Sequence, residues 1–259
     1  MSGGERVVAI HGWPPSVNDF YLPGWFYPWI TKFTVLVWIA VAVIIIFFLT
    51  AYRKPQIVPT KKQWIAESIY GFARNNVAVE MIGHEGLRFA PYLATLFSFL
   101  LVTNIFSIVP LIQVSPNAHI AFPAVLAFIS WIMFMYVGAR KHGVGKYIKM
   151  SLVPPGVPGY MLPLIVPLEF LSTFILRPFT LALRLFANMF AGHVILLVFT
   201  LGGFVLLDSS QWFIKPISVV SWAMAIALTF FEALIAVLQA YVFILLTSSY
   251  IQGSLAEEH

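Results

Sequence analysis

Long runs of apolar residues, separated by short groups of charged residues, form the main pattern of this chain. The first run occupies residues 33–52 and ends at two basic residues. Because a helix needs about 20 apolar residues to cross a bilayer, this run predicts a first span. The next charge-poor stretch is too long for one crossing and contains a turn signal, Ser115-Pro116-Asn117. It therefore predicts two further spans, at 89–114 and 120–137.

Two longer apolar tracts follow, at 167–207 and 216–250. As single helices they would extend about 60 Å and about 50 Å, against about 30 Å for the hydrocarbon layer. Either each tract is broken, for which Pro178 offers a kink, or both helices lie steeply tilted. We favour an antiparallel hairpin of two long tilted helices, since continuous helices keep every backbone hydrogen bond inside lipid.

Residues 60–84 carry a different pattern, in which apolar residues recur at roughly helical spacing between polar ones. The apolar positions are Trp64, Ile65, Ile69, Phe72, Val77 and Met81. This pattern is typical of an amphipathic helix that lies in the plane of the membrane interface. A connecting helix that packs on other subunits is the alternative. The predicted fold class is thus an all-α membrane protein with about five membrane-embedded helices and one interfacial amphipathic helix.

The composition agrees with a single membrane domain over residues 1–259. Apolar residues make up 60% of the chain and charged residues only 10%, which excludes an ordinary water-soluble globule. Since Cys is absent, Fe–S clusters, thiol nucleophiles and Cys-based zinc sites are excluded. The segments outside the predicted helices are an outer N-terminal segment at 1–32, a basic and then proline-rich cytoplasmic loop at 138–166, and a cytoplasmic tail at 251–259.

The basic residues predict how the chain is oriented, because Lys and Arg collect on the cytoplasmic side of membrane proteins. Six of the 15 basic residues fall between the first two predicted spans, and four fall after the third. The opposite side receives three. We therefore predict that the N-terminus lies outside and that the C-terminus lies in the cytoplasm.

The last two tracts contain ionisable residues at membrane depth, where a charge costs several kcal/mol and usually marks an ion path. These residues are Glu169, Arg177, Arg184, His193 and Glu232. At 100° per residue, Arg184 shares one helix face with several polar residues, provided that Pro178 bends the helix little. The residues on that face are Glu169, Arg177, Thr180 and Asn188, and His193 lies on the opposite face.

Small residues near Arg184 indicate that its face meets another protein. Ala187 and Ala191 lie on this face, and small side chains let a neighbouring helix come close. We therefore predict that Arg184 faces a partner rather than lipid. Because guanidinium keeps its proton at any physiological pH, its role would be electrostatic rather than that of a proton relay.

Glu232 and Gln239 are seven residues apart and share a face of the last tract. In an antiparallel hairpin, the outer halves of the two tracts meet, so His193 and Glu232 are predicted neighbours. Histidine titrates near neutrality, and a partly desolvated glutamate moves toward that range. The pair is therefore a candidate for accepting and passing protons.

Three segments carry a resemblance to a known family. Residues 181–193 have the sequence LALRLFANMFAGH, which resembles the signature of subunit a of the bacterial-type F-type ATP synthases. The segments 238–243, LQAYVF, and 103–110, TNIFSIVP, resemble further motifs of that family, and the Glu-Glu-His ending is also similar. The resemblance extends from about Trp64 to the end of the chain.

The resemblance implies a proton-translocating stator beside a rotating ring of c subunits. Arg184 would occupy the position of the essential arginine, which pairs with a ring carboxylate and separates two half-channels. The outer half-channel would be lined by Glu232, His193, Asn188, Gln239 and Asn104. The inner half-channel would be lined by Glu169, Ser172, Arg177 and Thr180.

The implied partners are the c-ring, the peripheral-stalk b subunits, other membrane-sector subunits and membrane lipid. The resemblance implies no cofactor, no metal, no nucleic acid and no nucleotide bound by this chain, which would be no enzyme by itself. The implied location is an energy-transducing membrane, the bacterial plasma membrane. His193 favours protons over sodium as the coupling ion.

Other interpretations stay open at the level of sequence. An ion-coupled secondary transporter also uses buried charges, although such proteins usually show internal repeats and we find none here. Arg184 could pair with an acid of its own chain, Glu232 could snorkel to the interface, and His193 could be a packing residue. Glu169 could cap a helix start, and Arg177 could bind a lipid phosphate.

Overall fold

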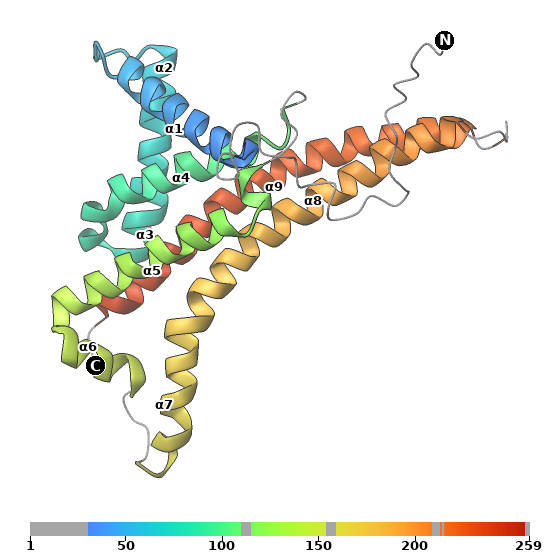
Figure 1. Cartoon of the computed structure of the whole chain (residues 1–259). Coiled ribbons are helices and arrows are strands. Elements are labelled where there is room, and N and C mark those ends of the chain that lie inside the picture. Colours follow the sequence, from blue (N-terminus) through green and yellow to red (C-terminus); the bar gives the residue numbers. More distant parts are fainter. Residues whose placement is uncertain (1–30, 110–114, 154–158, 209–212, 214, 257–259) are drawn as a thin grey trace.

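The computed structural model describes residues 31–109, 115–153, 159–208, 213 and 215–256, and the chain is helical over most of these ranges (Figure 1). No β-strand occurs in the described ranges. The α-helices are α1 (Lys32–Ala51), α2 (Lys61–Gly71), α3 (Glu80–Ile82), α4 (Ala90–Ile105), α5 (Ala121–His142), α6 (Val144–Leu152), α7 (Leu162–Phe170), α8 (Arg177–Asp208) and α9 (Lys215–Leu255). The predicted outer segment at 1–32 lies outside the described residues apart from its last two.

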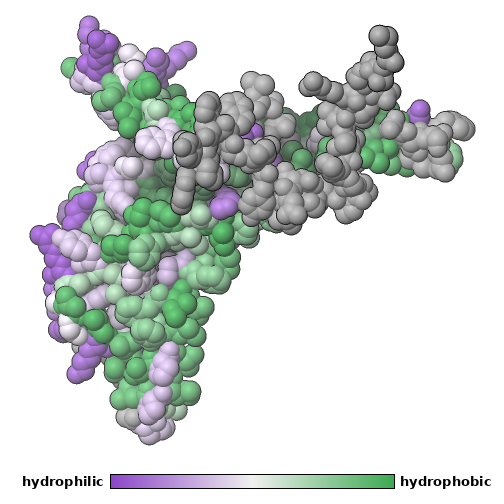
Figure 2. All heavy atoms as spheres, viewed as in Figure 1, coloured by the Kyte–Doolittle hydropathy of each residue, from purple (hydrophilic) through white to green (hydrophobic). Residues whose placement is uncertain are grey.

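Among the described residues, five helical stretches are long and apolar enough to cross a membrane, which confirms the all-α membrane fold class. They are Lys32–Ala51, His84–Ile105, Ala121–His142, Leu162–Leu207 and Lys215–Leu255. Large apolar side chains stand outward on them, and Trp38 of α1 is 73% exposed. Figure 2 shows such apolar surface over the body of the molecule and polar side chains gathered along one edge. An apolar surface of this extent requires lipid or protein to cover it.

The second span differs from the predicted range 89–114. A 3₁₀ turn at His84–Phe89 leads into α4, and the helix ends at Ile105, well before residue 114. Tight backbone turns follow, in which the Ser107 N–H donates to the Asn104 carbonyl at 3.1 Å. The Ser107 hydroxyl donates to the same carbonyl at 2.8 Å. Serine and asparagine side chains compete in this way with helical hydrogen bonds, and an apolar run gives no sign of it.

The segment predicted as a cytoplasmic loop, 138–166, is helical over much of its described length, and its place in the cytoplasm stays a prediction. The third span continues past residue 137 to His142, because basic residues in its last turn interact favourably with the negative end of the helix dipole. Gly143, with φ of 83°, ends that helix and begins α6. Tyr147 of α6 packs against Gly138, whose missing side chain makes room for the ring. Burial raises the pKa of Tyr147 above its ordinary value.

The last two helices are longer than the predicted ranges 167–207 and 216–250. The first helical stretch begins at Leu162, and α9 continues to Leu255, into the predicted tail at 251–259. No break occurs at Pro178. Instead, the preceding turn at Leu171–Leu176 is π-helical, with the Arg177 N–H donating to Ser172 five residues back. Proline lacks the N–H that would bond four residues back, and a π turn is one way for a helix to adapt.

The helices α8 and α9 lie side by side and antiparallel, as predicted for the hairpin (Figure 1). Figure 1 also shows the helical stretch from α7 to α8 curving along its length. The tilt of this hairpin relative to a bilayer stays a prediction.

The segment predicted to be one amphipathic helix at 60–84 consists of α2, a π-helical stretch at Phe72–Val79, and α3. It packs on its own chain, with Val77 fully buried against α4 and α9. Trp64 is 61% exposed and Ile65 is 43% exposed, so the predicted apolar positions do not all face one way. A π-helical stretch turns less per residue than an α-helix, which separates the two ends of the pattern. Its place at the membrane interface stays a prediction.

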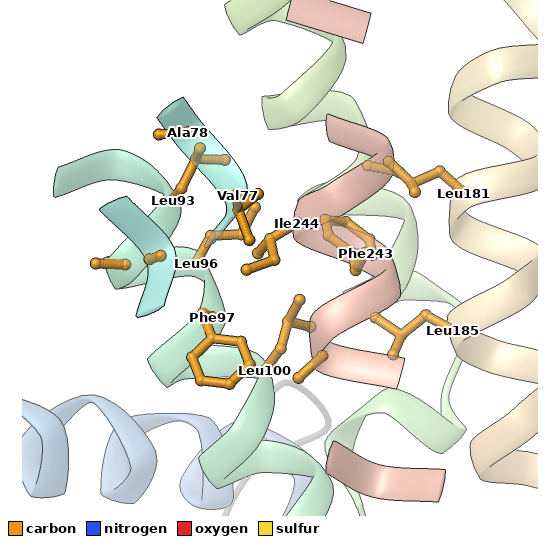
Figure 3. Close-up of a cluster of buried hydrophobic side chains, with 14 of the residues drawn as sticks. Val77, Ala78, Leu93, Leu96, Phe97, Leu100, Leu181, Leu185, Phe243 and Ile244 are labelled. Atoms are coloured by element: carbon orange, nitrogen blue, oxygen red, sulfur yellow. The ribbon is translucent and has the colours of Figure 1, made fainter. Parts of the chain in front are cut away.

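The main core joins the π-helical stretch, α4, α8 and α9 (Figure 3). Helix α9 lies between α4 and α8. Its Ile244 is directed toward Val77 and Leu96, and its Phe243 toward Leu185. Because lipid is as apolar as these side chains, close van der Waals packing rather than exclusion of water holds such helices together. This core fixes α8 and α9 against the rest of the chain.

Candidate functional site

Polar and small residues join α8 to α9 along the hairpin. The Asn188 side-chain amide donates from Nδ2 to Gln239 Oε1 at 2.6 Å. Further along, a Cβ on Gly192 would lie 3.5 Å from the carboxyl carbon of Glu232, so the glycine lets this side chain pack on the backbone of α8. Near the ends of the hairpin, Ser221 Oγ donates to the Phe199 carbonyl at 2.6 Å. Small residues and side-chain hydrogen bonds of this kind are typical of helix contacts in membranes.

Glu232 is a buried carboxyl group in the middle of a spanning helix. Its side chain is 4% exposed, and neither carboxyl oxygen has a hydrogen-bond partner among the residues that the structure describes. The Ser107 hydroxyl lies near it. His193, 5% exposed, directly follows Gly192 on α8, and Lys32 at the start of α1 lies near its ring. A buried carboxyl group without partners is costly, which makes it a candidate for proton transfer.

A buried polar cluster lies beside Glu232, and we call it the Asn104 network. Asn104 donates from Nδ2 to the carbonyl of Ala236, one turn from Glu232 on α9, at 3.1 Å. Asn117 donates from Nδ2 to Asn104 Oδ1 at 2.7 Å and to Thr103 Oγ1 at 2.9 Å. The members of the network are Thr103, Asn104, Ser107, Ser115 and Asn117, and none is more than 4% exposed.

Of the Asn104 network, the sequence pointed only to Asn104 as a site residue. Ser115 and Asn117 were interpreted as a turn signal, and Ser115 indeed caps the 3₁₀ turn Pro116–Ala118. Their second role depends on the fold, which places that turn against α4. Ser115 Oγ donates to the Thr103 carbonyl at 2.9 Å. The available signal was the group of polar residues inside an otherwise apolar stretch.

Arg184 lies on an exposed face of α8. Its side chain is exposed, and so are Ala187, Asn188 and Ala191 on the same face. In the described part of the chain, both ion pairs found involve Glu85, with Arg88 and with Lys141. Arg184 has no hydrogen bond or ion pair with any described residue, so no internal acid found there neutralises it.

The residues predicted for the inner half-channel lie before Arg184 along the chain. Arg177 places its guanidinium carbon 5.5 Å from the centre of the Tyr250 ring. Thr180 donates from Oγ1 to the Leu176 carbonyl of its own helix at 2.7 Å. Glu169 and Ser172 are half-buried, and no hydrogen bond or ion pair joins either of them to another described side chain.

The predicted alignment of Glu169 with Arg184 assumed a regular helix. The π-helical turn at Leu171–Leu176 lies between them, so rotation at 100° per residue does not apply across it. Arg184 and Asn188, which lie on the regular part of α8, do share an exposed face. Within the described ranges, no three His, Asp or Glu side chains lie close enough to hold a metal ion.

Comparisons with known proteins agree on one family. A model of the ATP synthase A chain family matches residues 34–252. ATP synthase subunit a of a Nocardioides species is 41% identical over 259 residues, covering 95% of this chain and 94% of the relative. The subunit a of Rhodococcus erythropolis is 44% identical, covering 95% of this chain and 91% of the relative. The family match includes α8 and all but the last three residues of α9, and the chain therefore belongs to the ATP synthase A chain family.

Proposed function

We propose that this chain is the proton-translocating stator subunit of a rotary ATP synthase in an energy-transducing membrane. The observation that carries the proposal is the pairing of two features on one hairpin. Arg184 is a cation exposed on a face with small residues, and Glu232 is a carboxyl group buried against Gly192 of the same helix. Family membership and the names of the relatives support the same role.

Arg184 supplies a fixed positive charge to a carboxylate on a rotating c-ring. A guanidinium at membrane depth stabilises the ionised form of a nearby acid and keeps its own proton at physiological pH. The exposed Ala187 and Ala191 leave room for a ring helix to approach. A ring carboxylate that reaches Arg184 therefore releases its proton, and the cation bars direct passage of protons between the two half-channels.

The outer half-channel leads protons to the ring through polar groups of the hairpin and of α4. Glu232 and His193 exchange protons, and Gln239 and Asn188 extend the polar path toward Arg184, supported by their 2.6 Å hydrogen bond. Asn104 joins this path through its bond to the Ala236 carbonyl, between Glu232 and Gln239 on α9. The titratable His193 favours protons over sodium.

The inner half-channel runs on the opposite side of Arg184 along α7 and α8. Its polar residues are Glu169, Ser172, Arg177 and Thr180. Thr180 and Arg184 are four residues apart and both exposed, which supports a path along this face. The contact of Arg177 with Tyr250 puts its charge beside α9 as well.

The contact between the basic end of α5 and the end of α9 supports a cytoplasmic C-terminus. Lys141 at the end of α5 lies 3.8 Å from Glu85, and it donates to the Leu255 carbonyl at the end of α9 at 3.0 Å. The end of α9 thus lies on the same side as the basic residues, which collect in the cytoplasm. The N-terminus then lies outside the bacterial plasma membrane. The peripheral-stalk b subunits and the c-ring are the proposed partners in the membrane sector.

The test is Arg184→Ala in the assembled complex, with Arg74→Ala as the matched control. Arg74 is exposed in the π-helical stretch before α3, so its loss changes the charge equally at a distance from the hairpin. We expect Arg184→Ala to abolish ATP-driven acidification of vesicles while the complex still assembles, and the control to pump normally. Acidification that persists in Arg184→Ala would refute the proposed function.

A further inference from the structure

A cavity of about 490 Å³ lies between the 3₁₀ turn that precedes α4 and the last turns of α5. Its polar walls include Arg88, Arg140, Lys141 and Glu85. None of its lining residues is among those proposed for proton transfer, and its use does not depend on the role of Arg184. In Figure 2, the polar edge of the molecule coincides with the region where α3 and α5 end in Figure 1.

The charge of this cavity favours an anion. Three of its lining side chains are cations and one is an acid, Glu85. The acid is shared, since it lies 3.3 Å from Arg88 and 3.8 Å from Lys141. Arg140 has no acid within ion-pair distance among the described residues, and its Nη1 donates to the Tyr136 hydroxyl at 3.1 Å. The surplus of positive charge and the remaining guanidinium donors suit a phosphate group.

The rest of the cavity is apolar and continues into the spanning region. Met133 and Val137 lie four residues apart on one face of α5, and Phe89 lines the cavity from the turn before α4. Arg88 and Arg140 lie near the ends of the two candidate spans His84–Ile105 and Ala121–His142. The cations therefore lie at headgroup depth, with apolar side chains one to two turns deeper.

We propose that this cavity binds an anionic phospholipid, with the phosphate on Arg88 and Arg140 and the start of an acyl chain against Met133 and Val137. Basic pockets between spanning helices on the cytoplasmic side are suited to such headgroups. The apolar walls distinguish this ligand from free phosphate and from an acidic protein segment, because neither would cover them. Lys141, held by the Leu255 carbonyl, adds charge to the site and joins it to the end of α9.

The test is lipid binding to the purified full chain in detergent micelles, measured by native mass spectrometry with dioleoyl phosphatidylglycerol. The key variant is Arg88→Gln with Arg140→Gln. The matched control is Arg53→Gln with Arg74→Gln, which removes two exposed arginines outside the cavity. Each basic residue near an anionic lipid surface contributes about fivefold to binding, so we expect the key variant to bind about 25-fold more weakly. We expect the control to bind within about twofold of the parent chain.

A third variant separates binding from a structural role. Glu85→Gln removes the acid that opposes the phosphate, so we expect it to bind phosphatidylglycerol about fivefold more tightly although it loses both ion pairs. If Glu85, Arg88 and Lys141 only stabilised the fold, the loss of the Glu85 carboxylate would weaken lipid binding. Far-ultraviolet circular dichroism identifies any variant that does not fold. If the arginine variant does not fold, the tighter lipid binding expected of Glu85→Gln still tests the proposal.

Four results would overturn the proposal. The first two are equal lipid binding by the key variant and its control, and weaker lipid binding by Glu85→Gln than by the parent chain. The third is that dioleoyl phosphatidylcholine binds as tightly as dioleoyl phosphatidylglycerol. The fourth is that inorganic phosphate or a glutamate-rich peptide displaces the lipid at equal concentration. Phosphate displacement would assign the cavity to a free anion, and peptide displacement would assign it to an acidic protein segment. Selective binding of phosphatidylglycerol that depends on Arg88 and Arg140 supports the proposal.

Discussion

The Asn104 network offers a direct test of how buried polar groups stabilise this membrane fold. Asn117 uses both of its amide protons, one on Asn104 Oδ1 at 2.7 Å and one on Thr103 Oγ1 at 2.9 Å. Asn117→Ala removes both donors and leaves Asn104 Oδ1 buried without them. The fold positions Asn104 against Ala236 of α9, so the loss weakens a contact between α4, α9 and the turn that carries Asn117.

The size of the effect follows from the two hydrogen bonds. Side-chain hydrogen bonds between membrane helices contribute about 0.6 kcal/mol on average and up to about 1.7 kcal/mol. Two bonds at a fully buried site therefore predict a loss of about 1–3 kcal/mol in the free energy of unfolding. Asn117→Asp keeps the volume of the side chain but not the amide donors, so we expect it to cost at least as much.

The assay is unfolding of the full chain in mixed micelles, by titration with sodium dodecyl sulfate and far-ultraviolet circular dichroism. Asn75→Ala, at an exposed position of the π-helical stretch, is the control, and we expect a change within about 0.5 kcal/mol. A loss below about 0.5 kcal/mol for Asn117→Ala would refute the reasoning. A large loss for Asn117→Ala with none for Asn117→Asp would assign the effect to packing instead.

A pair of glycine variants and two single variants test other contacts. Gly86→Ala brings a Cβ against the backbone carbonyl of the preceding π-helical stretch, so we expect a loss of about 1–3 kcal/mol in the same titration, whereas Gly71→Ala, in open space, stabilises by about 0.5–1 kcal/mol; similar values for the two would contradict the packing described. Arg177→Leu removes the cation–π contact with Tyr250, so we expect the free energy of unfolding in the same titration to fall by about 0.5–2 kcal/mol. Glu232→Gln cannot release a proton, so if Glu232 passes protons as proposed, we expect proton transfer in reconstituted vesicles to slow about tenfold or more. An unchanged rate would reduce Glu232 to a packing residue.

The sequence predicted the spanning helices well because their signal is strong and local. A run of about 20 apolar residues has few alternatives to a membrane helix, and all five such stretches are found. On the regular part of α8, helical spacing also placed Arg184 and Asn188 together on one face, and both are exposed there. Where the backbone is regular, the sequence determines which side chains share a face.

The remaining features depend on contacts that periodicity does not carry. The end of α4 at Ile105 is set by polar side chains that bond the nearby backbone, inside a stretch that is apolar on average. Each of the two π-helical stretches changes the helix face on which the residues beyond it lie. The face that carries Glu169 therefore cannot be calculated from that of Arg184 by regular helical spacing. Asn117 joins the site only because the fold brings its turn to α4, and no local pattern contains that information.

The exposed guanidinium of Arg184 also affects how such a protein can be made in a cell. If the c-ring is its partner, as proposed, a newly inserted copy holds this cation against hydrocarbon tails until the ring arrives, at a cost of several kcal/mol. Unassembled copies are thus less stable in the bilayer than copies whose Arg184 face is covered. The charge proposed to serve turnover in the assembled complex is therefore unfavourable in an unassembled copy.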